Sequence, residues 1–151
     1  MWDRVRREVE FELSQLRKLM SEHASLLREV GSGEPDTAHR LALGATINSF
    51  YGGIESIFRR IAQEIDHKLP TGESWHRDLL MAVAQATGDR PSVISAELLE
   101  TLRDYLGFRH VFRKGYAFDL KWPRMAHLAL ACQPTLDRLT TELQSFFGGT
   151  R

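Results

Sequence analysis

The feature that most constrains the fold of this chain is a helical spacing of apolar residues that recurs along nearly its whole length. In the first thirty residues the apolar positions lie three, four or seven apart, which places them on one face of an amphipathic helix running to about Val30. That stripe consists of Val5, Val9, Leu13, Leu16, Met20, Leu27 and Val30. No segment alternates apolar and polar residues for long enough to predict a strand. The pattern therefore predicts a protein built from helices.

Glycine and proline residues divide the chain into five helical blocks. The first block is broken at 31–35, and Asp36 or Thr37 can cap the second. The blocks that follow are a second to about 65, a third from about 74 to a stop at 88–91, a fourth from about 95 to 114, and a last one from 122 to 147. The sequence thus predicts one all-α domain over residues 1–151, an up-and-down antiparallel bundle of about five helices.

Four glycines carry specific expectations. Gly44, Gly52 and Gly53 lie inside the second block, where each costs up to about 1 kcal/mol relative to alanine, so a close helix contact or a bend is expected there. Gly115 follows the fourth block and suits the left-handed position just past a helix end.

Composition narrows the class of protein. The chain has 151 residues, 42% of them hydrophobic, and its 20 basic residues balance its 20 acidic ones, so it is expected to fold and its net charge points to no polyanionic partner. The single cysteine, Cys132, excludes a disulfide framework and is expected to be a small buried residue. The first residues lack an apolar signal core, and no apolar run reaches the roughly 20 residues that span a membrane. We expect a soluble, cytoplasmic protein without membrane contact.

Both long helices carry apolar residues outside their main stripe. These are Trp2, Phe11, Leu19 and Leu26 in the first helix and Tyr51 and Phe58 in the second. The extra apolar width favours a homodimer, because it exceeds what one bundle face needs. Thickening of the chain's own core is the alternative.

The segment 103–124 is basic in an otherwise neutral protein. It holds six lysine or arginine residues against two aspartates, with aromatic residues between them. Such a patch suits RNA, since the charges bind phosphates and the rings stack on unpaired bases, and Arg103 and Arg113 are candidate RNA-binding residues. The alternative is a solvated helix face whose positive end complements the helix dipole.

Helical geometry separates the roles of these residues. Arg109 falls on the same face as Leu98, Leu102 and Tyr105, and because burying an unpaired guanidinium is costly we expect it to face a cleft or an interface. The side chains at 103, 110 and 114 form a second stripe. Together they place the imidazole of His110 among permanent cations, an arrangement that can transfer protons and stabilise a pentavalent phosphate.

The segment from Gly107 to Tyr116, Gly-Phe-Arg-His-Val-Phe-Arg-Lys-Gly-Tyr, resembles the signature of HepT-like proteins of the HEPN superfamily. In that signature an arginine and a polar residue precede a histidine and a tyrosine near the end of a long helix. The segments 51–58 and 69–80 also resemble a HepT-like subgroup, so the resemblance covers most of the chain.

The resemblance implies a helical bundle that dimerises and brings two copies of the motif to a shared cleft. Many HEPN proteins are metal-independent ribonucleases, and HepT-like members are typically toxins paired with a nucleotidyltransferase-fold antitoxin, which in some pairs transfers AMP to the motif tyrosine. By position, Arg109 matches the motif arginine, His110 the polar residue and Tyr116 the tyrosine that would be modified. No cofactor is implied.

Lys114 stands where the family has its catalytic histidine. A free lysine has a pKa near 10.4 and is a poor base at neutral pH, although it can bind phosphate. One hypothesis is therefore a ribonuclease toxin in which Arg109 holds the phosphate, His110 exchanges protons and Lys114 assists electrostatically. Another is a non-catalytic binding or regulatory companion of a nucleotidyltransferase, and a third is a purely structural dimeric bundle.

The other histidines point to no further chemistry. His23 and His39 are expected on helix surfaces, and His127 has no evident partner. His67 and His76 flank the loop between the second and third helices and could line the cleft, but structural roles are expected for both. No metal-ligand spacing is present, so we expect no metal site.

Overall fold

The computed structural model describes residues 2–29, 33–116 and 119–148. Its elements in chain order are α1 (Asp3–Glu22), α2 (Ala24–Arg28), α3 (Thr37–Ile61), the π-helix η2 (Ala62–Asp66), α4 (Trp75–Val83), α5 (Ala96–Lys114) and α6 (Trp122–Gly148). No strand occurs in these three ranges, where the sole β-type pairing is the isolated bridge between Thr87 and Arg90. The all-α prediction is confirmed.

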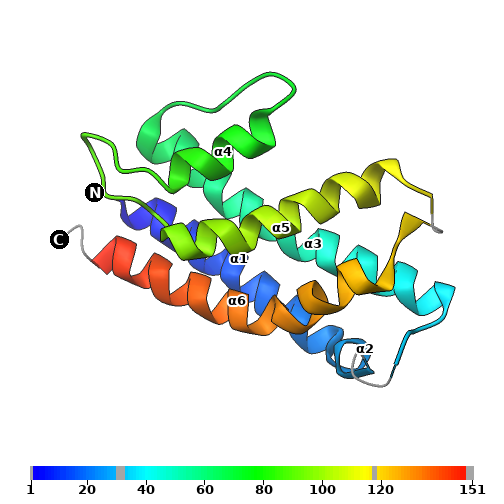
Figure 1. Cartoon of the computed structure of the whole chain (residues 1–151). Coiled ribbons are helices and arrows are strands. Elements are labelled where there is room, and N and C mark those ends of the chain that lie inside the picture. The colour runs from blue at the N-terminus through cyan, green and yellow to red at the C-terminus, as the bar shows by residue number, and fades with distance from the viewer. Residues whose placement is uncertain (1, 30–32, 117–118, 149–151) are drawn as a thin grey trace.

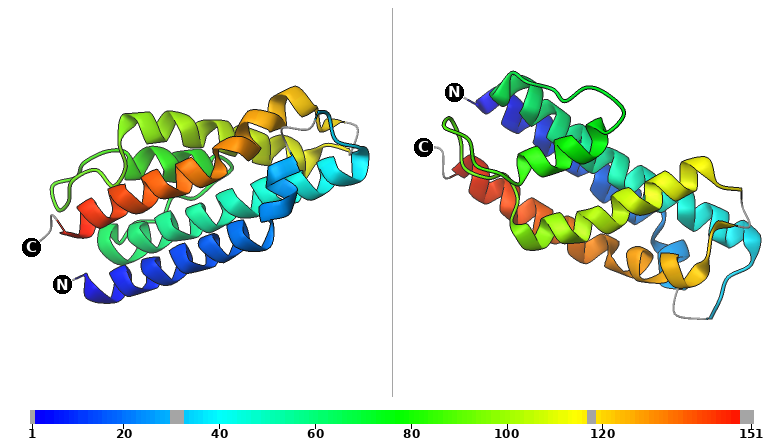
Figure 2. Two further views of the ribbon diagram at one scale, coloured as in Figure 1. Left: turned by 90° about the horizontal axis from the view of Figure 1, so that it is seen from below. Right: turned by 45° about the horizontal axis from the view of Figure 1, so that its top comes forward.

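Four long helices form an antiparallel bundle. Figures 1 and 2 show α1, α3, α5 and α6 side by side, alternating in direction, with both termini at one end. α3 contacts each of the other three, and contacts between α6 and α1 close the bundle. α4 is short and packs on α3 and α5. The predicted up-and-down bundle is therefore observed, with α4 as an addition on one side.

The core lies where the apolar stripes of the helices meet. Phe50 of α3 and Tyr105 of α5 pack with their ring centroids 5.3 Å apart, and the Tyr105 hydroxyl donates a 2.6 Å hydrogen bond to the Leu128 carbonyl. A Cβ atom on Gly53 would lie 2.6 Å from Cδ2 of Leu16 on α1, and one on Gly44 would lie 2.8 Å from the ring of Phe112 on α5. The close contacts expected at Gly44 and Gly53 are confirmed.

The prediction of one unbroken first helix to Val30 is wrong. The helix breaks at His23, which separates α1 from α2, and its Nδ1 atom lies 2.7 Å from Oγ1 of Thr46 on α3. This half-buried contact also shows that His23 is not a simple surface residue. Val30 lies outside the described residues.

The left-handed conformation predicted for Gly115 is also wrong. Its backbone is extended, with φ −87° and ψ 164°, because the chain leaves α5 directly into the turn at Tyr116 and Asp119. A Cβ atom at this position would lie 2.9 Å from the Val111 carbonyl oxygen and 3.0 Å from Cβ of Asp119. Glycine is needed there for close approach of the turn. His67, which follows η2, is the non-glycine residue with a left-handed backbone among the described residues, with φ 53°.

Most of the apolar residues outside the main stripes pack against the core of their own chain. Tyr51 and Phe58 are fully buried, and Leu19 packs against the core. Trp2 stacks on Phe146 with centroids 5.4 Å apart, whereas Phe11 is 62% exposed. Leu26, the sixth of the set, also packs against the core. Core thickening thus accounts for most of this surface, and the homodimer stays a prediction.

Arg90 fixes the end of α4 relative to η2. Its side chain has no exposed surface and makes a two-pronged ion pair with Asp66, Nε to Oδ1 at 2.6 Å and Nη2 to Oδ2 at 2.9 Å. The same guanidinium donates to the carbonyls of Ala82, Gln85 and Pro91. Ala82 lies in the last turn of α4, Gln85 lies just past its end, and Pro91 lies in the loop that follows. The Arg90 bonds tie the end of α4 and the loop after it to η2.

Within the described ranges, no helix is both long and apolar enough to cross a membrane.

Candidate functional site

A cleft of about 600 Å³ opens between α4 and α5. Figures 1 and 2 show α4 lying beside α5. The cleft is lined mostly by polar and charged side chains: Glu73, Ser74, His76, Arg77, Met81, Arg103, Leu106, Arg109 and His110, together with Gly107. Three arginines and two histidines face a single glutamate in this lining, so the cleft favours an anionic ligand.

Arg109 is the least exposed of the charged residues that the sequence predicted for the site. It is half-buried and lines the cleft, as its place on the apolar stripe of α5 led us to expect. Burial raises the pKa of the neighbouring Tyr51 hydroxyl, the Glu55 carboxylate raises it further, and the Arg109 guanidinium lowers it. Within the described ranges no carboxylate lies within ion-pairing distance of Arg109. Its charge is therefore available to a bound phosphate.

A buried carboxylate and a histidine meet at the wall of the cleft. Oε2 of Glu55, on α3, lies 2.7 Å from Nδ1 of His76, at the start of α4. The side chain of Glu55 is 9% exposed and that of His76 is 24% exposed. The Trp75 ring packs against the imidazole with centroids 3.6 Å apart, and the Arg59 guanidinium lies 5.2 Å from the Trp75 centroid. The imidazole is thus held from two sides.

This pair was not predicted. The sequence placed His76 near the cleft but in a structural role, and Glu55 was not singled out. The signal was present in α3, because Glu55 follows Tyr51 by four residues and so lies on the buried face of an apolar helix. A carboxylate on such a face needs a polar partner. The sequence alone could not identify that partner, which comes from another helix.

Arg103 and His110 join Arg109 in the cleft. Arg103 is exposed, forms a 3.1 Å ion pair with Glu100 one turn before it, and donates to the sulfur of Met81 on α4. His110 is exposed and also lines a second depression, of about 460 Å³, at the end of α5.

Lys114 lines that second depression, with Lys121 and Arg124, and not the Arg109 cleft. Arg113 is exposed and lines neither of them. The fold therefore brings Arg103, Arg109 and His110 together and places Lys114 one helical turn beyond His110.

Tyr116 lies past the end of α5 and is 73% exposed. Its backbone N–H donates a 2.9 Å hydrogen bond to Oδ2 of Asp119, and its carbonyl accepts one from the Asp119 N–H at 2.8 Å. The turn thus presents the tyrosine at the surface, next to the depression that holds Lys114 and Asp119.

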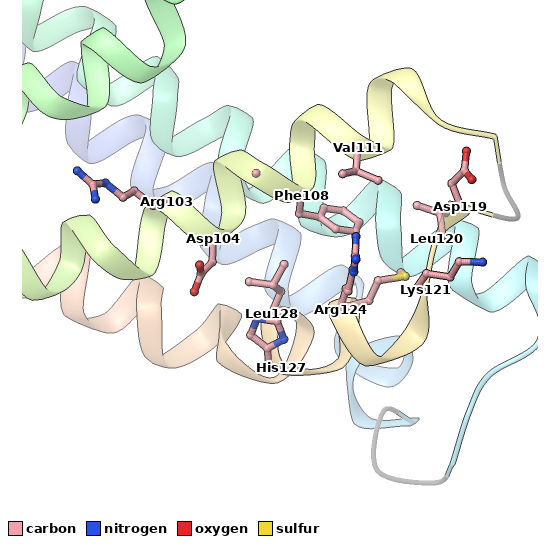
Figure 3. A pocket seen from close by; sticks show the side chains of 12 residues that line it. Arg103, Asp104, Phe108, Val111, Asp119, Leu120, Lys121, Arg124, His127 and Leu128 are labelled. Atoms are coloured by element: carbon pink, nitrogen blue, oxygen red, sulfur yellow. The ribbon is translucent and has the colours of Figure 1, made fainter.

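A smaller groove of about 310 Å³, not expected from the sequence, runs between α5 and α6. Figure 3 shows its apolar floor, to which Phe108 and Leu128 contribute, and the charged residues around it, Arg103 and Asp104 from α5 and Arg124 before His127 on α6. Arg103 lines both this groove and the α4–α5 cleft.

Cys132 takes no part in any of these surfaces. It is buried beside Tyr105, and burial raises the pKa of its thiol to about 11. The prediction of a small buried residue is confirmed. The residues that the structure describes contain no group of three or more His, Cys, Asp or Glu side chains placed to hold a metal ion.

Comparison with known proteins identifies the family. A family described as "HepT-like protein" matches residues 42–149, from α3 through the last turn of α6, which is most of the chain. No curated protein and no solved structure matched. The family match agrees with the resemblance noted in residues 107–116 and covers the whole α4–α5 cleft. The chain belongs to the HepT-like family.

Proposed function

We propose that this protein is a ribonuclease toxin that cleaves RNA without a metal ion in the α4–α5 cleft. The observation that carries the proposal is Arg109, half-buried in a cationic cleft beside His110 and without a carboxylate at ion-pairing distance among the described residues. Partial burial of a guanidinium without a built-in counterion costs free energy, and a ligand with negative charge offsets that cost. The scissile phosphate of RNA supplies it.

The reaction that fits these groups is attack by the substrate's own 2′-hydroxyl on the adjacent phosphorus. Arg109 binds the non-bridging phosphate oxygens, where charge develops in the transition state. His110 exchanges protons with the reacting oxygens. Lys114, in the neighbouring depression, adds positive charge near His110 without contacting the Arg109 cleft. The products are a 2′,3′-cyclic phosphate and a 5′-hydroxyl end.

The flanking basic residues extend the binding surface along α5. Arg103 lines the cleft, and Arg113 is exposed near the end of α5. Contacts of this kind act on the RNA backbone and weaken as salt rises. We propose that they bind single-stranded RNA on either side of the scissile phosphate.

Two protein partners complete the proposal. The protein acts as a homodimer, in which the motifs of two copies face one cleft, and a nucleotidyltransferase-fold antitoxin silences it by transferring AMP to Tyr116. The exposure of Tyr116 at the surface supports this acceptor role. Intact-mass analysis after co-expression with such a partner tests it, since the gain of one AMP should be lost in Tyr116→Phe.

Incubation of the purified protein with end-labelled RNA in EDTA tests the activity itself. We expect cleavage to products with 2′,3′-cyclic phosphate and 5′-hydroxyl ends, and no cleavage at a linkage whose 2′-hydroxyl is replaced by hydrogen. If the protein is inert on RNA but binds the nucleotidyltransferase tightly, the ribonuclease proposal is wrong and the non-catalytic companion takes its place.

A further inference from the structure

We propose that His76 is a catalytic residue of the cleft, the general base that removes the proton from the attacking 2′-hydroxyl, and that Glu55 is its positioning residue. The inference rests on the ribonuclease activity proposed above and adds the group that starts the reaction. Its substrate class is RNA, since only a ribose supplies this hydroxyl.

The contact between the two side chains fixes the hydrogen on the His76 ring. Nδ1 lies 2.7 Å from the carboxylate of Glu55. A carboxylate has only acceptor oxygens, so Nδ1 carries the hydrogen and donates it, and in the neutral ring Nε2 then holds the lone pair. A carboxylate placed in this way holds an imidazole in one tautomer and stabilises the imidazolium that forms when the ring accepts a proton.

The burial of the pair suits a base that is held firmly and still reaches substrate. The Glu55 carboxylate is almost enclosed by the fold, whereas the His76 ring reaches the surface of the cleft. Trp75 packs on the ring and restricts its rotation. Arg109 and His110 line the same cleft from α5, so a phosphate bound to Arg109 has a histidine on α4 and another on α5. His76 thereby supplies a second histidine in the cleft, whereas the family's position for a catalytic histidine holds Lys114 in this chain.

The proton and electron movements balance with these three groups. Nε2 of His76 takes the proton of the 2′-hydroxyl while O2′ forms a bond to phosphorus. The P–O5′ bond breaks, its electron pair stays on O5′, and His110 donates a proton to that oxygen. Arg109 balances the charge on the non-bridging oxygens. His76 is left as an imidazolium next to Glu55, and His110 is left neutral.

The charged and titratable groups around His76 come from α3, from α4 with the loop before it, and from α5. They are Glu55, Arg59, Glu73, Arg77, Arg103, Arg109 and His110. Because one histidine must be neutral and the other protonated, we expect a bell-shaped pH dependence of the single-turnover cleavage rate.

The first test is kinetic and uses His76→Asn, Glu55→Gln and the matched control His67→Asn. His67 is an exposed histidine at a left-handed position, which asparagine tolerates, and it does not line the cleft. We expect His76→Asn to lower the single-turnover cleavage rate by about 10²- to 10⁴-fold. The pH profile of this variant should lack the fall in rate at low pH, its acid limb. The variant should still bind a 2′-deoxy strand as the wild type does. Glu55→Gln should lower the rate and shift that limb, and the control should match the wild type.

The second test separates base from acid with an RNA whose scissile O5′ is replaced by sulfur. A thiolate leaves without a proton, so the defect of His110→Asn should disappear on this substrate while that of His76→Asn persists. The opposite pattern would overturn the assignment of His76 as the base.

A third measurement needs no variant. The ¹⁵N resonances of the imidazole rings in the unmodified protein should show His76 with a protonated Nδ1 in its neutral form and should shift when the 2′-deoxy strand binds. A hydrogen on Nε2 in the neutral form would refute the inference. If the wild type cleaves RNA and His76→Asn cleaves equally well, the inference fails while the proposed function stands. If the wild type does not cleave, both are wrong.

Discussion

Removing the carboxylate of Asp66 should destabilise the fold strongly, because it leaves the Arg90 guanidinium buried without its counterion. The pair is two-pronged, and the Arg90 side chain has no exposed surface. Breaking a buried ion pair from one side typically costs about 3–5 kcal/mol of unfolding free energy. Three backbone carbonyls still accept hydrogen bonds from Arg90 in this variant. We therefore expect Asp66→Ala to lower the free energy of unfolding by about 3 kcal/mol, the lower end of that range. For a chain of this length that lowers Tm by roughly 6–12 °C.

Urea unfolding followed by circular dichroism measures this loss, and a double-mutant cycle isolates the pair. We expect Asp66→Ala combined with Arg90→Met to lose less than the sum of the two single changes, by about 0.5–3 kcal/mol. The control is Glu10→Ala, which removes a carboxylate from an exposed ion pair with Arg6 and should cost less than about 1 kcal/mol. A loss at Asp66 no larger than at Glu10, or strict additivity in the cycle, would refute the reasoning.

Three further outcomes follow from local geometry. Gly53→Ala should destabilise the protein by about 1–3 kcal/mol, because the added Cβ atom clashes with Leu16. Gly52→Ala should stabilise the protein by up to about 1 kcal/mol, because the space around Gly52 is open. The midpoints of urea unfolding compare the two variants. Cys132, whose thiol pKa burial raises to about 11, should react with iodoacetamide at pH 8 only after unfolding. Hydrogen bonds from His39 lower the pKa of the Asp36 carboxyl in the folded protein below its ordinary value of 3.8. The stability that this carboxylate contributes is therefore present above pH 3.8 and is lost as the pH falls through the lowered pKa. Asp36→Asn should flatten this part of the acid unfolding curve.

The fold was largely predictable because helical periodicity and breakers are local properties of the chain. Asp36, one of the two expected caps, caps α3, and α5 begins after Ser95, near the expected start of the fourth block. The break at His23 was missed, because it is accompanied by a tertiary contact with Thr46 that no local pattern shows. The extended Gly115 was missed for a similar reason, since the turn at Asp119 determines its conformation.

The candidate site was predictable along α5 and not across helices. Arg109 falls on the buried stripe at a spacing that the sequence shows directly, so its place in a cleft could be expected. Glu55 and His76 are 21 residues apart and meet because α4 packs against α3. Lys114 lies one turn past His110, and the sequence could not show that the second depression, which Lys114 lines, differs from the Arg109 cleft.

The rate of RNA cleavage by Arg109→Ala tests the central claim most directly. The matched control is Arg17→Ala, which removes an exposed arginine of α1 outside the cleft. With both variants folded as judged by circular dichroism, we expect the single-turnover rate on one end-labelled RNA to fall about 10²- to 10³-fold for Arg109→Ala and to stay at the wild-type value for Arg17→Ala. Cleavage by Arg109→Ala at the wild-type rate would contradict a catalytic role for the α4–α5 cleft.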